Sequence, residues 1–176
     1  IAVDPQAQVA AVADGPGGLQ LISYADLANP AVVATAPGNF THVVLLGGVA
    51  YASTGGTVQA LDAQTGELLG TLGGAQGAIT GLALDGTTLY AMDAGRMLRA
   101  VALQGGAMTV LGSVLLPGGG NGLVVGNGVA TVPAGDAGGN GGYRFGGIKS
   151  YEFRDVANND PFAGWGLVVF YTLPSD

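Results

Sequence analysis

The chain has 176 residues, of which 34 are glycine and only 10% are charged, and its formal net charge at pH 7 is −7. Its five basic residues are scattered, which argues against nucleic acid as a partner, because such binding needs clustered Lys and Arg to neutralise phosphates. The absence of cysteine excludes zinc–thiolate sites, disulfides and cysteine nucleophiles. No apolar run approaches the ~20 residues of a membrane-spanning helix, so we expect no transmembrane segment.

A motif of small and apolar residues that ends in a polar turn recurs along the chain. Its four copies are Val9–Asp14, Val49–Thr54, Leu89–Asp93 and Val129–Pro133. The turn positions 14, 54, 93 and 133 lie 40, 39 and 40 residues apart. Repeats of this length with four short strands each are typical of β-propeller blades.

Each unit is expected to contain one strand before the motif and two strands after it. The strands expected before the motif are Ile1–Val3, His42–Leu46, Thr80–Leu84 and Gly122–Val125. Those expected next after it are Gly18–Ile22, Thr57–Leu61, Met97–Ala102 and Gly147–Phe153. Those expected last in each unit are Ala31–Ala34, Leu68–Leu72, Thr109–Leu115 and Gly166–Tyr171. Glycine-bearing turns such as Asp85-Gly86 connect them, as tight hairpins require.

The sequence therefore predicts an all-β propeller of about four blades, each with four antiparallel strands. The expected blades cover approximately residues 1–40, 41–78, 79–118 and 119–176. Stacking buries both faces of each blade and leaves only short edges. Because the chain starts at Ile1, without an initiator methionine, we expect a mature form or a fragment, and blades that belong to a larger ring, chain or complex.

The stretch Asp14–Pro30 runs through a Gly-Gly turn, a Leu-x-x-Ile strand and an Asp-x-x-Asn-Pro turn. It resembles the LVIVD repeat of bacterial and archaeal surface propellers, and Gly146–Pro161 is similar with one residue inserted before the proline. The stretch Val58–Leu69 looks like a quinoprotein or YVTN blade with its Leu-Asp-x-x-Thr-Gly turn. The tryptophan that follows this turn in quinoprotein repeats is absent, so we expect no quinone cofactor.

The last segment offers an alternative domain division. Ala163–Tyr171 looks like a strand of the β-sandwich modules in bacterial adhesin-like proteins, which would make residues 143–176 the start of a second module. The fourth-blade interpretation is preferred, because the turn from Asp155 to Pro161 falls where a blade needs one.

Catalytic residue types are scarce. His42 is the only histidine, and no nucleophile-elbow motif accompanies it, so we interpret it as a polar residue at a strand end. Asp14, Asp62 and Asp93 lie in or beside turns, where aspartate commonly bonds the nearby backbone. Glu67 and Glu152 are the only glutamates and fall in different units. We therefore expect a protein without catalytic residues.

The loop over residues 133–145 is the main irregularity, because it lengthens the fourth unit by about ten residues. Asp136 and Asn140 offer oxygen ligands for calcium, although the ordered acidic spacing of a calcium loop is missing. Tyr143, Arg144 and Phe145 at its end are residue types that anchor interfaces. Trp165, the only tryptophan, is a second candidate contact, with packing at an outer strand as the alternative.

These observations favour a non-catalytic binding or structural scaffold that engages another protein or self-assembles. The resemblance to surface propellers implies a secreted, periplasmic or cell-surface location in a bacterium. Two alternatives are a calcium- or carbohydrate-binding adhesin module and the propeller domain of a periplasmic enzyme.

Overall fold

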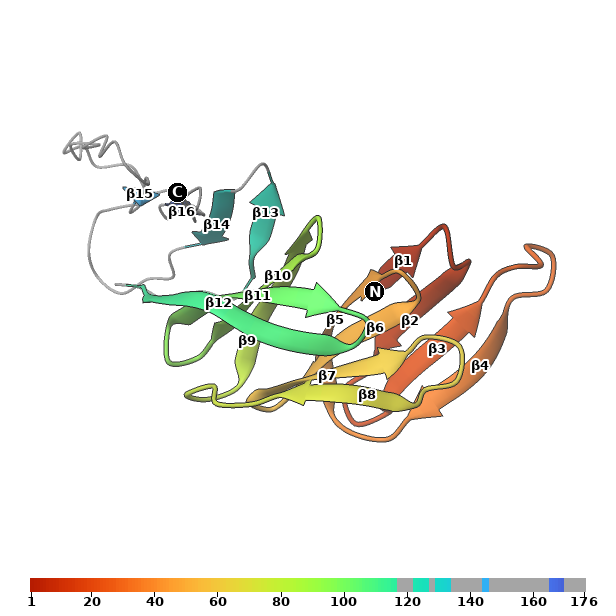
Figure 1. Cartoon of the computed structure of the whole chain (residues 1–176). Coiled ribbons are helices and arrows are strands. Elements are labelled where there is room, and N and C mark those ends of the chain that lie inside the picture. The colour runs from red at the N-terminus through yellow and green to blue at the C-terminus, as the bar shows by residue number, and fades with distance from the viewer. Residues whose placement is uncertain (117–121, 127–128, 134–143, 146–164, 170–176) are drawn as a thin grey trace, which may run out of the picture.

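The computed structural model of the chain describes residues 1–116, 122–126, 129–133, 144–145 and 165–169. The regular structure in these residues is entirely β-strand, arranged as four sheets of four strands each (Figure 1). The expectation of an all-β fold is therefore confirmed. Within the described ranges, no helix is long and apolar enough to cross a membrane.

The first three sheets are antiparallel meanders in which each strand pairs with the next along the chain. The first sheet contains β1 (Ala2–Asp4), β2 (Val9–Ala13), β3 (Leu19–Ser23) and β4 (Ala31–Ala36). The second contains β5 (Phe40–Leu46), β6 (Val49–Thr54), β7 (Thr57–Asp62) and β8 (Leu68–Leu72). The third contains β9 (Ile79–Asp85), β10 (Thr88–Asp93), β11 (Met97–Gln104) and β12 (Ala107–Leu115).

Glycine makes the tight hairpins of these sheets. Gly47 and Gly48 join β5 to β6 with φ of 57° and 77°, a conformation that side-chain-bearing residues avoid. Gly86 joins β9 to β10 with φ of 57°. The Gly-Gly and Asp-Gly turns of the sequence thus fix where each strand reverses.

The sheets stack in chain order through their first and second strands. β5 packs against β1 and β2, β9 packs against β5 and β6, and β13 packs against β9. Figure 1 shows the first and fourth sheets at opposite ends of the row. The described strands therefore form an open stack rather than a closed ring.

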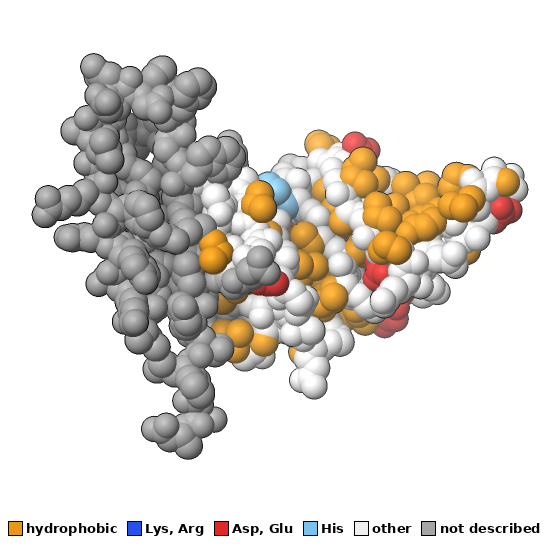
Figure 2. Space-filling view, turned by 90° about the horizontal axis from the view of Figure 1, so that it is seen from above, with side chains coloured by type: hydrophobic (Ala, Val, Ile, Leu, Met, Phe, Trp, Pro, Cys, Tyr) orange, Lys and Arg blue, Asp and Glu red, His pale blue; other side chains and the backbone are white. Residues whose placement is uncertain are grey.

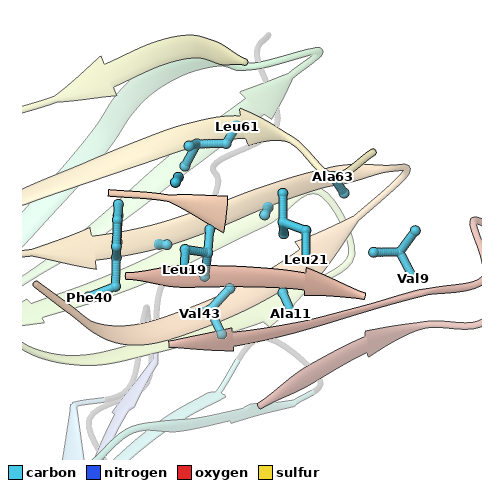
Figure 3. Packing of buried hydrophobic residues seen from close by; sticks show 11 residues of the cluster. Val9, Ala11, Leu19, Leu21, Phe40, Val43, Leu61 and Ala63 are labelled. Atoms are coloured by element: carbon cyan, nitrogen blue, oxygen red, sulfur yellow. The ribbon is translucent and has the colours of Figure 1, made fainter. Parts of the chain in front are cut away.

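Interleaved aliphatic side chains fill the interface between the first and second sheets (Figure 3). Leu19 and Leu21 of β3 are fully buried, and Phe40 and Val43 of β5 lie in the same cluster. Each such burial contributes about 1.5–3 kcal/mol relative to an exposed side chain. β6, the second strand of the second sheet, carries small residues such as the fully buried Ala50, which allow the two sheets to approach closely.

The fourth sheet departs from the expected order. It contains β13 (Val124–Gly126), β14 (Val129–Pro133), β16 (Trp165–Val169) and β15 (Arg144–Phe145), in that order across the sheet. β16 pairs antiparallel with β14 and takes the place expected for 147–153, a segment outside the described residues. The expectation that Gly166–Tyr171 forms the last strand of this sheet is wrong, because β16 lies between β14 and β15, and β15 pairs parallel with β16 at the edge of the sheet. The alternation of apolar and polar residues indicates that a segment is a strand. It does not indicate which strand pairs with it, because pairing and register depend on both strands.

Candidate interaction surface

A buried aspartate joins the first sheet to the second. Oδ1 of Asp4 accepts the amides of Gln6 at 3.0 Å and Ala7 at 3.1 Å, and Oδ2 accepts the amide of Gly48 at 3.1 Å. These hydrogen bonds, led by those from Ala7 and Gly48, hold the pKa of Asp4 below its ordinary value. The carboxylate serves the packing of the two sheets and has no free oxygen for a ligand.

A second buried aspartate, Asp93 of β10, joins the third sheet to the segment that connects β8 to β9. Its carboxylate accepts the amides of Gln76 at 2.9 Å and Met97 at 3.0 Å, and the Arg99 guanidinium lies 3.6 Å away. Arg99 also donates to the carbonyl of Gly73 at 3.2 Å and to that of Gly74. The apolar cleft beside this group has room for about one water molecule. Its polar groups are already paired, so the cleft is not a small-molecule site.

His42 lies close to a serine but in a structural setting. Its Nδ1 is 3.3 Å from Oγ of Ser53, and that hydroxyl also lies 3.0 Å from Oγ1 of Thr41 and accepts the amide of His42. Ser53 is fully buried, which removes it from any substrate. The Ser53 hydroxyl instead bonds groups at a β-bulge between Phe40 and His42, where Thr41 has no partner residue on β6.

Three of the sequence-predicted contact residues lie in the backbone of the fourth sheet. Arg144 and Phe145 form β15, which lies beside β16, and Trp165 begins β16 opposite Pro133. Tyr143, Asp136 and Asn140 lie outside the described residues, so the predicted calcium ligands and the loop that carries them remain predictions. Within the described part of the chain, no group of three His, Asp or Glu side chains is placed to hold a metal ion.

A bulge recurs at the same place in the first three sheets, between the third strand and the outermost strand. The register shifts between Leu21 and Ile22, between Ala60 and Leu61, and between Ala100 and Val101. The partner strand therefore has one extra residue at each bulge, and each extra residue is a large aliphatic. These residues are Val33, Leu69 and Leu111.

Each extra residue follows another exposed aliphatic, so every outermost strand presents an apolar pair. We call these the rim pairs: Val32–Val33 on β4, Leu68–Leu69 on β8 and Val110–Leu111 on β12. All six side chains are between 42% and 59% exposed. The same exposed apolar pair therefore recurs on three successive sheets, which makes the rim pairs a candidate interaction surface.

The rim pairs were not predicted from the sequence. The sequence does contain a signal for them. Two consecutive aliphatic residues break the two-residue alternation of apolar and polar side chains that is typical of a strand. Their exposure depends on the bulge, and the bulge also disrupts the outer ladder, which discourages uncontrolled edge-to-edge pairing. At the outer edge of each sheet, the bulge therefore exposes aliphatic side chains for contact while it hinders backbone pairing with another strand.

Comparisons with known proteins show the fold. No family model matches the chain, and no curated protein matches it by sequence. Among solved structures, the computationally designed Ika4 protein is 16% identical with a TM-score of 0.60, over 77% of this chain and 83% of that one. BamB from Moraxella catarrhalis is 17% identical with a TM-score of 0.58, over 76% of this chain and 42% of that one.

The β-propeller domain of Cps50 (Swd1) from Myceliophteria thermophila is also similar. It is 17% identical with a TM-score of 0.57, over 73% of this chain and 50% of that domain. The chain thus spans half or less of the length of these two natural proteins. Together with the sheets described above, these similarities confirm the predicted class of protein: an all-β fold of β-propeller type.

Proposed function

We propose that this protein is a non-catalytic scaffold that binds another protein through its rim pairs. The observation that carries the proposal is the repetition of an exposed aliphatic pair at the same bulge of three successive sheets. Repetition matters because a partner that contacts several pairs together gains affinity from each without a deep pocket. Exposed aliphatics that served no contact would only raise the risk of aggregation.

The chemistry of the rim favours a protein partner. Within β4, β8 and β12 the described side chains include no charged group, so this surface has nothing to neutralise phosphates. Aliphatic pairs also lack the aromatic faces and polar groups by which a site holds a sugar. Apolar side chains on a rigid sheet edge suit the apolar core of a protein–protein interface.

We also propose that the protein is a bacterial surface propeller of the LVIVD-repeat kind. The stretch Asp14–Pro30, with its resemblance to the LVIVD repeat of surface propellers, supports a secreted, periplasmic or cell-surface protein of a bacterium. The absence of cysteine is compatible with that location. The buried, fully engaged state of Ser53 and Asp93 supports a non-catalytic role, because neither group is open to a substrate.

The test is a comparison of captured proteins by quantitative mass spectrometry. The bait is either the wild-type protein, a rim variant with Val33→Ser, Leu69→Ser and Leu111→Ser, or a control with Ile1→Ser, Leu27→Ser and Leu115→Ser. The control removes three exposed aliphatics outside the rim pairs. We expect one partner set to bind the wild type and the control and to be lost with the rim variant. Equal capture by all three baits would show that the rim is not the contact surface.

A further inference from the structure

The connection from the first sheet to the second carries the triplet Asn39-Phe40-Thr41. Asparagine, then any residue except proline, then serine or threonine is the acceptor sequence for N-linked glycosylation. The triplet occurs once in the chain. Because the motif is short, its surroundings in the folded chain decide whether a sugar can be carried there.

The side chain of Asn39 is open to solvent. It is exposed and makes no hydrogen bond to the part of the chain that the structure describes. In contrast, Nδ2 of Asn29 donates to Oδ2 of Asp26 at 2.9 Å. The residue before Asn39 is Gly38, and the facing residue is Gly15, where an added Cβ would lie 3.6 Å from Oδ1 of Asn39. Both neighbours thus lack side chains, which leaves room for a sugar on Nδ2 of Asn39.

The backbone of the triplet holds its two recognised side chains on the outside. The amide of Phe40 donates to the carbonyl of Gly15 at 3.1 Å, and the amide of Gly15 donates to the carbonyl of Phe40 at 2.8 Å. The Phe40 ring is 1% exposed and lies in the core between the first two sheets. Successive side chains of an extended segment point to opposite sides, and Asn39 and Thr41 are both exposed. A sugar on Asn39 would therefore extend away from the core.

The surface composition gives a sugar at this place a physical role. Figure 2 shows hydrophobic side chains gathered at the end of the molecule that the first sheet forms (right). Val3 of β1 is 56% exposed, and only 10% of the residues in the chain are charged. A bulky, hydrated oligosaccharide is solubilising. Attached where the chain leaves the first sheet, it would oppose unspecific association through this apolar surface.

We propose that Asn39 is an N-glycosylation site. The proposal rests on the secreted, periplasmic or cell-surface location proposed above, since this modification belongs to exported proteins. The donor is an oligosaccharide linked through the anomeric carbon of its first sugar to a lipid diphosphate. Nδ2 of Asn39 forms a C–N bond to that carbon, and the C–O bond to the diphosphate breaks. The lipid diphosphate leaves with the bonding electron pair, and one proton of Nδ2 passes to a base of the transferase.

The contacts of Thr41 determine when the transfer takes place. Oγ1 of Thr41 lies 3.0 Å from Oγ of Ser53 and 3.1 Å from Nδ1 of His42. The hydroxyl that the transferase recognises is therefore engaged in the folded chain, so we expect the triplet to be modified before β5 pairs with β6. Folding then accommodates the sugar, because Asn39 remains exposed. The nearest rim pair lies near the start of β4, whereas Asn39 follows the end of this strand, so the sugar leaves the rim pairs free.

Mass spectrometry of the chain isolated from the source organism tests the site. Cleavage after acidic residues releases the segment 27–62, which contains Asn29 as an internal control beside Asn39. We expect fragmentation to place an oligosaccharide on Asn39 and none on Asn29. An unmodified segment from a chain recovered outside the cytoplasm overturns the proposal and leaves the proposed location intact. An unmodified chain found only in the cytoplasm overturns both, and neither result bears on capture through the rim pairs.

Variants produced in the same organism test the recognition of the triplet. Asn39→Gln and Thr41→Ala are each expected to lose the sugar completely, while Thr41→Ser keeps the hydroxyl and is expected to retain the sugar. Circular dichroism checks that each variant is folded. Retention of the sugar in Asn39→Gln, or in Thr41→Ala, would show that the triplet is not the acceptor and would overturn the proposal.

Discussion

The carboxylate of Asp4 crosses the first inter-sheet interface and accepts the main-chain amide of Gly48 at 3.1 Å, 44 residues further along the chain. Gly48 lies in the tight turn between β5 and β6, so one side chain ties the first sheet to a hairpin of the second. The same carboxylate holds the amides of Gln6 and Ala7 in its own sheet. Asp4 thereby satisfies donors that no strand partner reaches.

Asp4→Ala is expected to lower the free energy of unfolding by about 2 kcal/mol, because it leaves amides without an acceptor at a buried position. Urea denaturation followed by fluorescence measures the change. Asp26→Ala is the matched control, since Asp26 also accepts a main-chain amide, from Ala28, but lies at the surface. A similar loss of unfolding free energy in both variants would show that the bond from Asp4 to the second sheet adds no stability beyond that of a surface turn.

The stability of the fold is expected to fall in two steps as the pH is lowered. Partial burial lowers the pKa of His42 below 6.5, so the unfolded chain takes up a proton first and stability falls as the pH drops below 6.5 toward the folded pKa. The pKa values of Asp4 and Asp62 lie below 3.8 because main-chain amides donate to them. Their contribution is present above 3.8 and is lost as the pH falls through their folded values.

Thermal unfolding as a function of pH measures both steps. The His42→Gln variant is expected to lose the upper step and keep the lower one. If the upper step persists in this variant, the protonation of His42 is not its cause.

Gly70 and Gly112 form a matched pair on two outermost strands. Each lies one position after the exposed bulge residue, Gly70 opposite Ala60 and Gly112 opposite Ala100. A Cβ at Gly70 would lie 2.5 Å from the carbonyl oxygen of Gly106, whereas one at Gly112 would meet nothing within 4 Å. Gly70→Ala is therefore expected to cost about 2 kcal/mol of stability through overpacking of two backbones.

Gly112→Ala is expected to change stability by less than about 0.5 kcal/mol, or to raise it slightly, because alanine loses less entropy in a strand. The difference between the two variants in denaturant midpoint tests the packing of β8 on β12. Equal effects would contradict the close approach at Gly106.

Calcium provides a separate test of the alternative function. If the protein is a scaffold without a calcium site, we expect no rise in its melting temperature when calcium is added after treatment with a chelator. A rise that disappears in the Asp136→Ala, Asn140→Ala variant would instead support the calcium-binding module, since a ligand of the native state raises its stability.

Much of the fold follows from local sequence. The polar turns near Asp14, Thr54 and Asp93 locate the strands of the first three sheets to within a few residues, because glycine turns and strand-length apolar runs are local features. Asp62 also behaves as the turn former expected of it, accepting the amides of Gln64 and Thr65.

The order of the fourth sheet and the rim pairs did not follow from the sequence, and both depend on pairing between strands. Alternation along β16 shows a strand but does not say that its neighbour is β14. Likewise, Leu69 is exposed because the register shifts between Ala60 and Leu61, and a register shift is a property of two strands together. The role of Asp4 could not be predicted from local sequence, because its partner Gly48 lies 44 residues further along the chain.

Photo-cross-linking at the rim pairs tests whether they form one shared contact surface for a protein partner. A benzophenone side chain would be placed singly at positions 33, 69 and 111, with exposed Gln64 and Gln104 as control positions. After irradiation with an extract of the source organism, we expect one and the same protein to be captured from all three rim positions and from neither control. Capture from the control positions alone, or of unrelated proteins at each rim position, would contradict a shared contact surface.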